Sequence, residues 1–335
     1  MRQILKHKNM DLSVKYMGLD LKSPIIVGSS GLTNSVEKVK ELESFGAGAV
    51  VLKSLFEEQI HFEADAAGKQ NDYDYPEAID YIKSYAKDNT INAYLKLIED
   101  CKKETKIPII ASLNCVTTGQ WLEFAKKMEN AGADAIELNV SLLPSDSEKT
   151  SAENEKVYFT IAEQVKKVVK IPVALKMSHY SAGLLNLIKT LSWTKNVDAF
   201  VLFNRYYNPD IDINTMKITS SGVFSTEGDL AASLRWVAIL SNQIETPISA
   251  TTGVHSGEDV IKQLLAGAQT VQVVSAIYKH GSSFVKTMLD DVQEWMKKQN
   301  KKSIEDFRGL VSYKNVHNAV AFERVQFMKY FGGIE

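Results

Sequence analysis

Polar residues close several short apolar segments of this chain of 335 residues. Lys53 and Lys176 each follow a run of aliphatic side chains, as do Asn114, Asn139 and Asn204. A lysine at the end of a buried strand needs a partner for its charge, and an asparagine offers both a donor and an acceptor. We expect such a set to bind a planar heterocycle with several carbonyl and ring-nitrogen atoms. A Ser–His–Asp site for hydrolysis is not indicated, because only one histidine, His179, lies next to such a segment end.

A second kind of signal lies near the C-terminus. Thr251, Thr252 and Gly253 precede one helical pattern, and Ser275 with Ala276 precedes another. Backbone N–H groups and hydroxyls at the beginning of helices bind phosphate dianions. The same residue types also cap helices without binding anything. The pattern therefore favours a phosphate site here and leaves ordinary capping as the alternative.

These residues sit on elements that alternate regularly. Short β-branched runs predict strands at 24–28, 49–53, 108–113, 134–140, 172–177, 198–203, 247–251 and 269–274. Amphipathic patterns predict helices at 36–45, 90–105, 119–130, 152–169, 182–194, 229–242, 258–265 and 283–298. Strands that are apolar throughout are buried on both faces, as in parallel sheets covered by helices.

A period of two strands runs through this pattern. Alternate strands open with proline, at positions 24, 108, 172 and 247, whereas a Gly-Ala pair at 48, 132 and 267 precedes three of the others. Proline suits the first residue of a strand, and glycine suits the end of a helix. Four such repeats predict an α/β fold of the (β/α)8 TIM-barrel type. A doubly wound open sheet is the alternative, but the GxGxxG expected after its first strand is absent.

We expect a single barrel domain over residues 1–335, with strands from about 24 to 274. Long loops at 54–89 and 205–228 follow the second and sixth strands. The carboxyl ends of barrel strands form one face, where the loops carry the chemistry. The polar residues above should therefore meet on that face, beneath these two loops.

Composition narrows the function classes. The formal charge of −2 offers no field for nucleic acid or anionic lipid, and no apolar run is long enough to span a membrane. Only two cysteines, Cys101 and Cys115, are present and the histidines are scattered, so no metal site is expected. Few cysteines suit a reducing compartment. We expect a cytoplasmic protein with a small-molecule substrate, bound neither to nucleic acid nor to a membrane.

Several segments together resemble a known family. They read MGLDLKSPIIVGSSG, GAVVLKS, AIELNVS, IPVALKMS and ISATTGVHSGEDVIKQLLAGAQTVQVVSAIY. In this order and spacing, across about residues 12–307, the chain resembles the class 1 dihydroorotate dehydrogenases. These are FMN-dependent TIM barrels that oxidise dihydroorotate to orotate in pyrimidine biosynthesis. The resemblance implies FMN as the cofactor and a pyrimidine-like substrate.

The resemblance also implies residue roles. Gly28, Ser29 and Ser30 would lie against the flavin ring, and Lys53 and Ser54 would contact it near the substrate. The other positions assigned to the cofactor are Asn139, Lys176, Asn204, Thr252, Gly253, Val274 and Ser275, and the strand-end residue Asn114 joins them. Lys53 and Asn139 are also candidate catalytic residues. Asn204 and Arg205 are the substrate candidates, with Arg205 pairing a carboxylate or, alternatively, Asp210 or Asp212 of its own loop.

The match fails at the proton acceptor. Class 1 members carry a catalytic cysteine in an Asn-x-Ser-Cys-Pro-Asn loop, but this chain has Leu142 at that position. Ser141, Cys115, Ser145 and His179 are the candidate replacements, although Cys115 could be an ordinary buried thiol. Alternatively, the substrate differs from dihydroorotate, or the chain binds FMN and has lost the activity.

A hypothesis of another class stays open beside these. A flavin-free, phosphate-binding lyase or isomerase could use Lys53 or Lys176 for Schiff-base chemistry. If the flavin assignment holds, we expect a soluble electron acceptor such as fumarate, and by the resemblance a homodimer.

Overall fold

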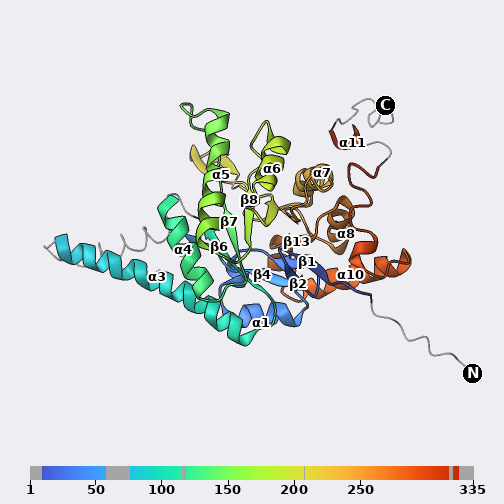
Figure 1. Cartoon of the computed structure of the whole chain (residues 1–335), viewed down its shortest axis with the longest axis horizontal. Helices are drawn as coiled ribbons and strands as arrows, with labels where there is room; N and C mark the ends of the chain where they lie inside the picture. The colour runs from blue at the N-terminus through green and yellow to red at the C-terminus, as the bar shows by residue number, and fades with distance from the viewer. Residues whose placement is uncertain (1–9, 58–75, 115–117, 207, 317–319, 324–335) are drawn as a thin grey trace, which may run out of the picture.

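Eight short parallel strands form the centre of the computed structural model (Figure 1), which describes residues 10–57, 76–114, 118–206, 208–316 and 320–323. The strands are β3 (Ile25–Val27), β4 (Ala49–Val51), β6 (Ile109–Asn114), β7 (Ala135–Asn139), β8 (Val173–Met177), β9 (Ala199–Leu202), β12 (Ile248–Thr251) and β13 (Thr270–Val273). The sheet closes on itself because β4 pairs with both β3 and β6. The predicted (β/α)8 barrel is confirmed, with its strands at the eight predicted places.

The two-strand period has a structural cause at the beginning of the strands. The second, fourth, sixth and eighth strands of the barrel are β4, β7, β9 and β13. The residue before each of them donates its N–H to the carbonyl of the first residue of the barrel strand before it. The four pairs are Gly48–Ile25, Asp134–Ile109, Asp198–Val173 and Gln269–Ile248, at 2.8–2.9 Å. In the last three pairs the side chain also accepts the N–H of that first residue, at 2.7–3.2 Å. In the first pair a Cβ on Gly48 would lie 2.1 Å from the carbonyl oxygen of Ser23, so only glycine fits.

The prolines complete this arrangement. Each lacks an N–H but its carbonyl still accepts an N–H from the preceding strand of the barrel. The bonds run from Val271 to Pro24, Val50 to Pro108, Ile136 to Pro172 and Phe200 to Pro247. One detail of the prediction was wrong: the glycine with left-handed φ at the end of the first helix is Gly46, at +95°, rather than Gly48.

Helices lie around the outside of the strands (Figure 1). They are α1 (Val36–Ser44), α3 (Pro76–Glu104), α4 (Thr118–Asn130), α5 (Ser151–Val168), α6 (Leu184–Trp193), α7 (Leu230–Leu240), α8 (Gly257–Ala266), α9 (Ser275–His280), α10 (Phe284–Lys298) and α11 (Val320–Glu323). Short 3-10 turns are η1 (Gly31–Thr33), η2 (Glu227–Asp229) and η3 (Ile304–Asp306). No helix in the described parts of the chain is both long and apolar enough to span a membrane.

Both predicted long loops contain secondary structure. The loop after the second strand is shorter than expected, because α3 begins at Pro76. The two-residue strand β5 (Leu55–Phe56) lies at the beginning of this loop and pairs with β6. The loop at 205–228 carries a hairpin of β10 (Pro209–Asp212) and β11 (Lys217–Ser220). A further hairpin, β1 (Val14–Tyr16) with β2 (Leu19–Leu21), precedes the barrel. The single-domain organisation over 1–335 stays a prediction.

Candidate functional site

A cavity of about 250 Å³ lies at the carboxyl ends of the barrel strands. Seven residues predicted to hold a cofactor line it together: Ser29, Lys176, Asn204, Thr252, Gly253, Val274 and Ser275. Arg205 and Gln272 lie in the same wall. Barrel closure therefore joins residues from the first, fifth, sixth, seventh and eighth barrel strands in one site.

The loops after β12 and β13 form one end of this cavity. Thr252 and Gly253 both have positive φ, at +77° and +80°. A Cβ on Gly253 would lie 2.1 Å from the backbone nitrogen of Leu230, at the beginning of α7, so this position accepts only glycine. The Thr252 hydroxyl donates to the carbonyl of Phe203 at 3.0 Å, and the Ser275 hydroxyl accepts the N–H of Ser225 at 3.0 Å. The loops are thus packed tightly enough to present backbone N–H groups in fixed positions.

The backbone at the end of the first barrel strand lies close to Val274, which follows the eighth strand. A Cβ on Gly28 would lie 2.8 Å from Cγ2 of Val274. The Ser30 hydroxyl caps η1 by accepting the N–H of Leu32 at 3.2 Å, so its observed role is structural. The absence of a side chain at Gly28 therefore lets Val274, which lines the cavity, pack directly against the end of the first barrel strand.

Lys176 enters the cavity beside a residue that sequence reasoning missed. Its Nζ lies 3.6 Å from Oε1 of Glu137, whose side chain is only 1% exposed. The other oxygen of Glu137 accepts a hydrogen bond of 2.6 Å from Nε2 of Gln272. The detectable signal was a glutamate and a glutamine inside otherwise apolar strands.

A cluster of amides and hydroxyls follows β7 and β9. Nδ2 of Asn204 donates to Oδ1 of Asn139 at 2.8 Å and to Oγ of Ser141 at 3.2 Å. Asn139 is the register partner of Lys176 across β7 and β8. These four predicted residues therefore lie together at the mouth of the barrel, and Ser141 is an exposed hydroxyl.

The residue in place of the family cysteine is firmly positioned. Ser178 donates its hydroxyl to the carbonyl of Leu142 at 3.0 Å, and Tyr158 contacts the same hydroxyl at 3.2 Å. Leu142 is partly buried against the core and carries no proton-accepting atom. The loop geometry is thus maintained without its expected base.

The other candidate bases differ in their surroundings. His179 packs against Tyr180 and Phe203, and burial lowers its pKa, so it is neutral over a wider pH range. It lines a second cavity with Tyr180 and Tyr206, beside Asn204 and Arg205. Ser145 is exposed on the loop after β7. Cys115 lies outside the described residues.

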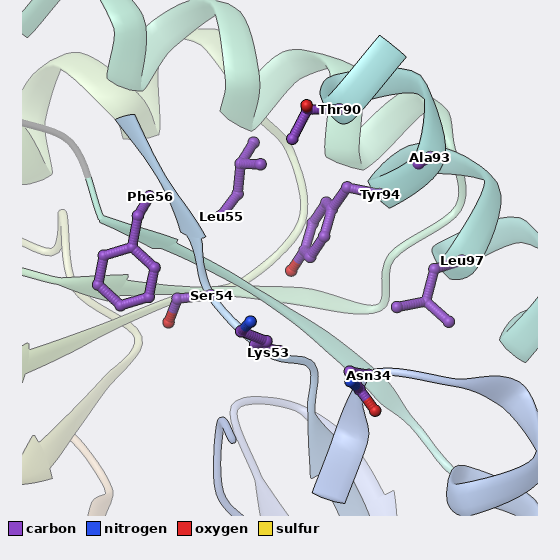
Figure 2. A pocket seen from close by; sticks show the side chains of 9 residues that line it. All are labelled: Asn34, Lys53, Ser54, Leu55, Phe56, Thr90, Ala93, Tyr94 and Leu97. Carbon is purple, nitrogen blue, oxygen red and sulfur yellow. The ribbon is translucent and has the colours of Figure 1, made fainter. Parts of the chain in front are cut away.

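Lys53 does not line the cavity that holds Lys176. It is exposed and lines a separate cavity of about 250 Å³ with Ser54, Asn34 and residues of β5 and α3 (Figure 2). Figure 2 shows the hydroxyl of Tyr94 pointing from α3 toward the turn at Lys53 and Ser54. The hydroxyls of Ser29 and Ser54 lie 3.0 Å apart and link the two cavities.

The predicted end of the third strand is also in place. Asn114 closes β6 and is half-buried, where it pairs in register with Phe56 of β5. It does not line the cavity that holds Lys176. Its role toward a cofactor stays a prediction.

Arg205 is anchored by the chain itself. Its guanidinium donates to the carbonyls of Gly222 and Val223, at 2.9–3.4 Å, and its Nε lies 3.9 Å from Asp229. The alternative pairing with Asp210 or Asp212 was wrong: these carboxylates accept backbone N–H groups of their own hairpin. Arg205 thereby fixes the segment that follows β11 against the cavity.

Comparisons with known proteins agree with this geometry. The sequence profile described as dihydroorotate dehydrogenase matches residues 11–296. The chain belongs to the dihydroorotate dehydrogenase family. It is accordingly an oxidoreductase of the dihydroorotate dehydrogenase type that acts on a CH–CH group, in a flavin-dependent family.

Three curated relatives carry the name dihydroorotate dehydrogenase B (NAD(+)), catalytic subunit. The one from Thermoplasma volcanium is 27% identical over 316 residues, covering 90% of this chain and 98% of the relative. The one from Endomicrobium trichonymphae is 28% identical, covering 92% and 99%. The one from Methanocaldococcus jannaschii is 26% identical, covering 86% and 94%. The similarity to these catalytic subunits therefore extends over nearly their whole length.

The anchoring role of Arg205 in this family member can be tested by Arg205→Lys. A lysine cannot donate to both carbonyls in the fork geometry of a guanidinium. Hydrogen bonds from a charged group contribute about 1.5–3 kcal/mol, so amide exchange in the segment 217–224 should become about tenfold faster or more. Hydrogen–deuterium exchange measures this, with Arg235→Lys on the exposed face of α7 as the control. Unchanged exchange in both variants would contradict the anchoring role.

Proposed function

We propose that this chain binds FMN at the mouth of its barrel and uses it to oxidise dihydroorotate or a related pyrimidine-like substrate. The observation that carries the proposal is the cavity lined by Lys176, Asn204, Thr252, Gly253 and Ser275. Its features fit the group at both ends. The tightly packed loops after β12 and β13 suit a phosphate, and the amides and the lysine at the other strand ends suit the edge of a flat ring.

The bound flavin would supply a two-electron acceptor for the hydride that leaves the substrate carbon. The residues of the chain would stabilise negative charge, orient the substrate and contact its carboxylate. The ammonium of Lys176 favours negative charge in the cavity, and the paired amides of Asn139 and Asn204 orient a substrate edge by donating and accepting hydrogen bonds. Arg205, in the same wall, is the proposed contact for a substrate carboxylate.

Ser141 is the proposed proton relay: its exposed hydroxyl would take the proton from the substrate carbon while it passes its own proton to solvent. It stands directly before Leu142, the position of the family cysteine, and its Oγ accepts a hydrogen bond from Asn204. That hydrogen bond orients the hydroxyl toward the cluster of amides. Lys53 and Ser54 line the separate cavity beside β5 and α3, and we propose that they contact the substrate side of the site.

The two alternatives have less support. Schiff-base chemistry at Lys176 would give no role to the flavin of a flavin-dependent family, and Nζ of Lys176 already faces Oε1 of Glu137 at 3.6 Å. An FMN-binding barrel without activity remains an outcome of the experiments below rather than a separate proposal.

The purified protein should show a flavin spectrum after incubation with FMN. Lys176→Ala should weaken FMN binding about tenfold or more, because a charge-assisted contact contributes about 1.5–3 kcal/mol. Fluorescence titration measures the dissociation constant, and Lys167→Ala on the surface of α5 is the control. If FMN does not bind the unmodified protein, the proposed function is wrong.

Leu142→Cys tests the missing base. If the pocket otherwise suits dihydroorotate, the added thiol should raise the anaerobic rate of flavin bleaching by dihydroorotate, by about 10²- to 10⁴-fold for a general base. Leu143→Cys, one residue further along the same loop, is the matched control and should give no gain. If neither the unmodified protein nor Leu142→Cys bleaches while FMN stays bound, dihydroorotate is not the substrate.

The electron acceptor and partners are also proposals. The relatives' names mention NAD(+) and describe catalytic subunits. This supports either a second subunit or a soluble acceptor that would take the electrons from the flavin. The low cysteine content supports a cytoplasmic location.

We further propose a homodimer formed through one face of the hairpin β10–β11. Ile211 and Ile218 are cross-strand partners, and Ile213 and Met216 are the first and last residues of the turn between the strands; the four are 66–85% exposed. An isolated two-stranded hairpin is at best marginally stable in water, so an apolar face of this size favours burial against another surface.

A double substitution, Ile213→Asp with Met216→Asp, should convert the dimer to a monomer, because it adds two charges to the face that would be buried. Light scattering after gel filtration measures the mass. Thr219→Lys, on the opposite face of the hairpin, is the control. A monomeric unmodified protein would contradict the dimer directly.

A further inference from the structure

A carboxylate is buried at the centre of the barrel, one layer below the site. Glu137 lies in β7 between Ile136 and Leu138, which are fully buried, and is itself 1% exposed. An unpaired buried carboxylate would cost several kcal/mol, so its partners define what it does there. Those found among the described residues are Gln272 and Lys176.

The two partners come from different sides of the barrel. Lys176 lies on the neighbouring strand β8, at the level of Asn139 and two residues nearer the mouth than the register partner of Glu137, which is Ala174. Gln272 lies on β13, which β12, β9 and β8 separate from β7 in the sheet. The carboxylate therefore sits beneath the ammonium, held from across the barrel interior.

Among the described residues, Glu137 and Gln272 each have one side-chain oxygen without a hydrogen bond. Gln272 satisfies Oε2, but Oε1 of Glu137 has no hydrogen bond and faces Lys176 at 3.6 Å. Oε1 of Gln272 is also without a partner and lies 3.4 Å from where a Cβ on Gly28 would be. The network thus extends from the barrel core to the floor of the cavity.

We propose that Glu137 is a positioning residue that holds the Lys176 ammonium at the barrel mouth and, through its own charge, lowers the reduction potential of the bound flavin. The second half rests on the proposed function, since it needs a flavin beside Lys176. A reduced flavin ring carries extra negative charge, which Lys176 stabilises and a carboxylate behind it partly offsets. In a region of low dielectric constant this offset is not screened away.

Loss of the charge of Glu137 should raise the reduction potential of the bound flavin. Glu137→Gln removes the negative charge but preserves the shape and the volume, so the reduced flavin becomes more stable. The midpoint potential of the FMN-loaded variant should rise by about 30 mV, which is a tenfold shift of a two-electron equilibrium. Equilibration with a reference dye measures this. Glu163→Gln, from a surface ion pair on α5, is the control and should leave the potential unchanged.

A second readout needs no flavin. Oε1 of Glu137 faces Nζ of Lys176 at 3.6 Å, so its removal should free the lysine side chain to reach a reagent in the cavity. In the protein without FMN, the acetylation rate of Lys176 in Glu137→Gln should rise several-fold, as measured by peptide mass spectrometry. Glu137→Asp withdraws the carboxylate by one methylene and should give intermediate values in both measurements, and it serves as the test if Glu137→Gln does not fold.

The outcomes separate the two proposals. Values equal to those of the unmodified protein in both measurements would overturn the role of Glu137. A changed acetylation rate with an unchanged potential would overturn the electrostatic half alone. If the unmodified protein does not bind FMN, the proposed function fails, and the acetylation rate by itself decides whether Glu137 holds Lys176.

Discussion

The site depends on closure of the barrel, which β4 completes by pairing with both β3 and β6, and on a backbone contact, repeated four times, that sets how neighbouring strands are staggered. In each repeat the residue before an even-numbered strand donates its N–H to the first carbonyl of the strand before it. Asp134, Asp198 and Gln269 add a side-chain acceptor to this contact. Because each contact fixes the stagger of two neighbouring strands, the carboxyl ends of all the strands arrive at one mouth.

That constraint explains why residues far apart in the chain act together. Asn139 and Asn204 are 65 positions apart but share a hydrogen bond, and Glu137 and Gln272 are 135 positions apart. None of these contacts involves a metal-binding group of three or more His, Cys, Asp or Glu residues, and no such group occurs in the described parts of the chain. The polar groups at and beneath the site are amides, hydroxyls, the Lys176 side-chain amine, the Arg205 guanidinium and the Glu137 carboxylate, a set suited to a ring with several heteroatoms.

The residue at the position where the resemblance leads one to expect a cysteine cannot take a proton. Leu142 offers its carbonyl to the hydroxyl of Ser178, which Tyr158 also contacts, so the loop after β7 is anchored to the end of β8 and to α5. Gly28 and Gly253 lie elsewhere at the mouth, where a Cβ would come within 2.8 Å and 2.1 Å of neighbouring atoms. The close packing of these strand ends and the residue Leu142 therefore belong to separate parts of the mouth.

The sequence by itself determined the barrel, because apolar strands, proline starts and glycine turns are local patterns that recur with the repeat. It also indicated most of the residues at the strand ends, since a polar group at the end of an apolar run is visible in one dimension. It missed Glu137 and Gln272, the length of α3 and the hairpin within the sixth loop. Only the tertiary structure separated Lys53 from Lys176 and assigned Arg205 to the carbonyls of Gly222 and Val223. The physical reason is that side-chain partners depend on which strands face one another across a closed barrel, and a distance of that kind leaves no periodic mark in the sequence.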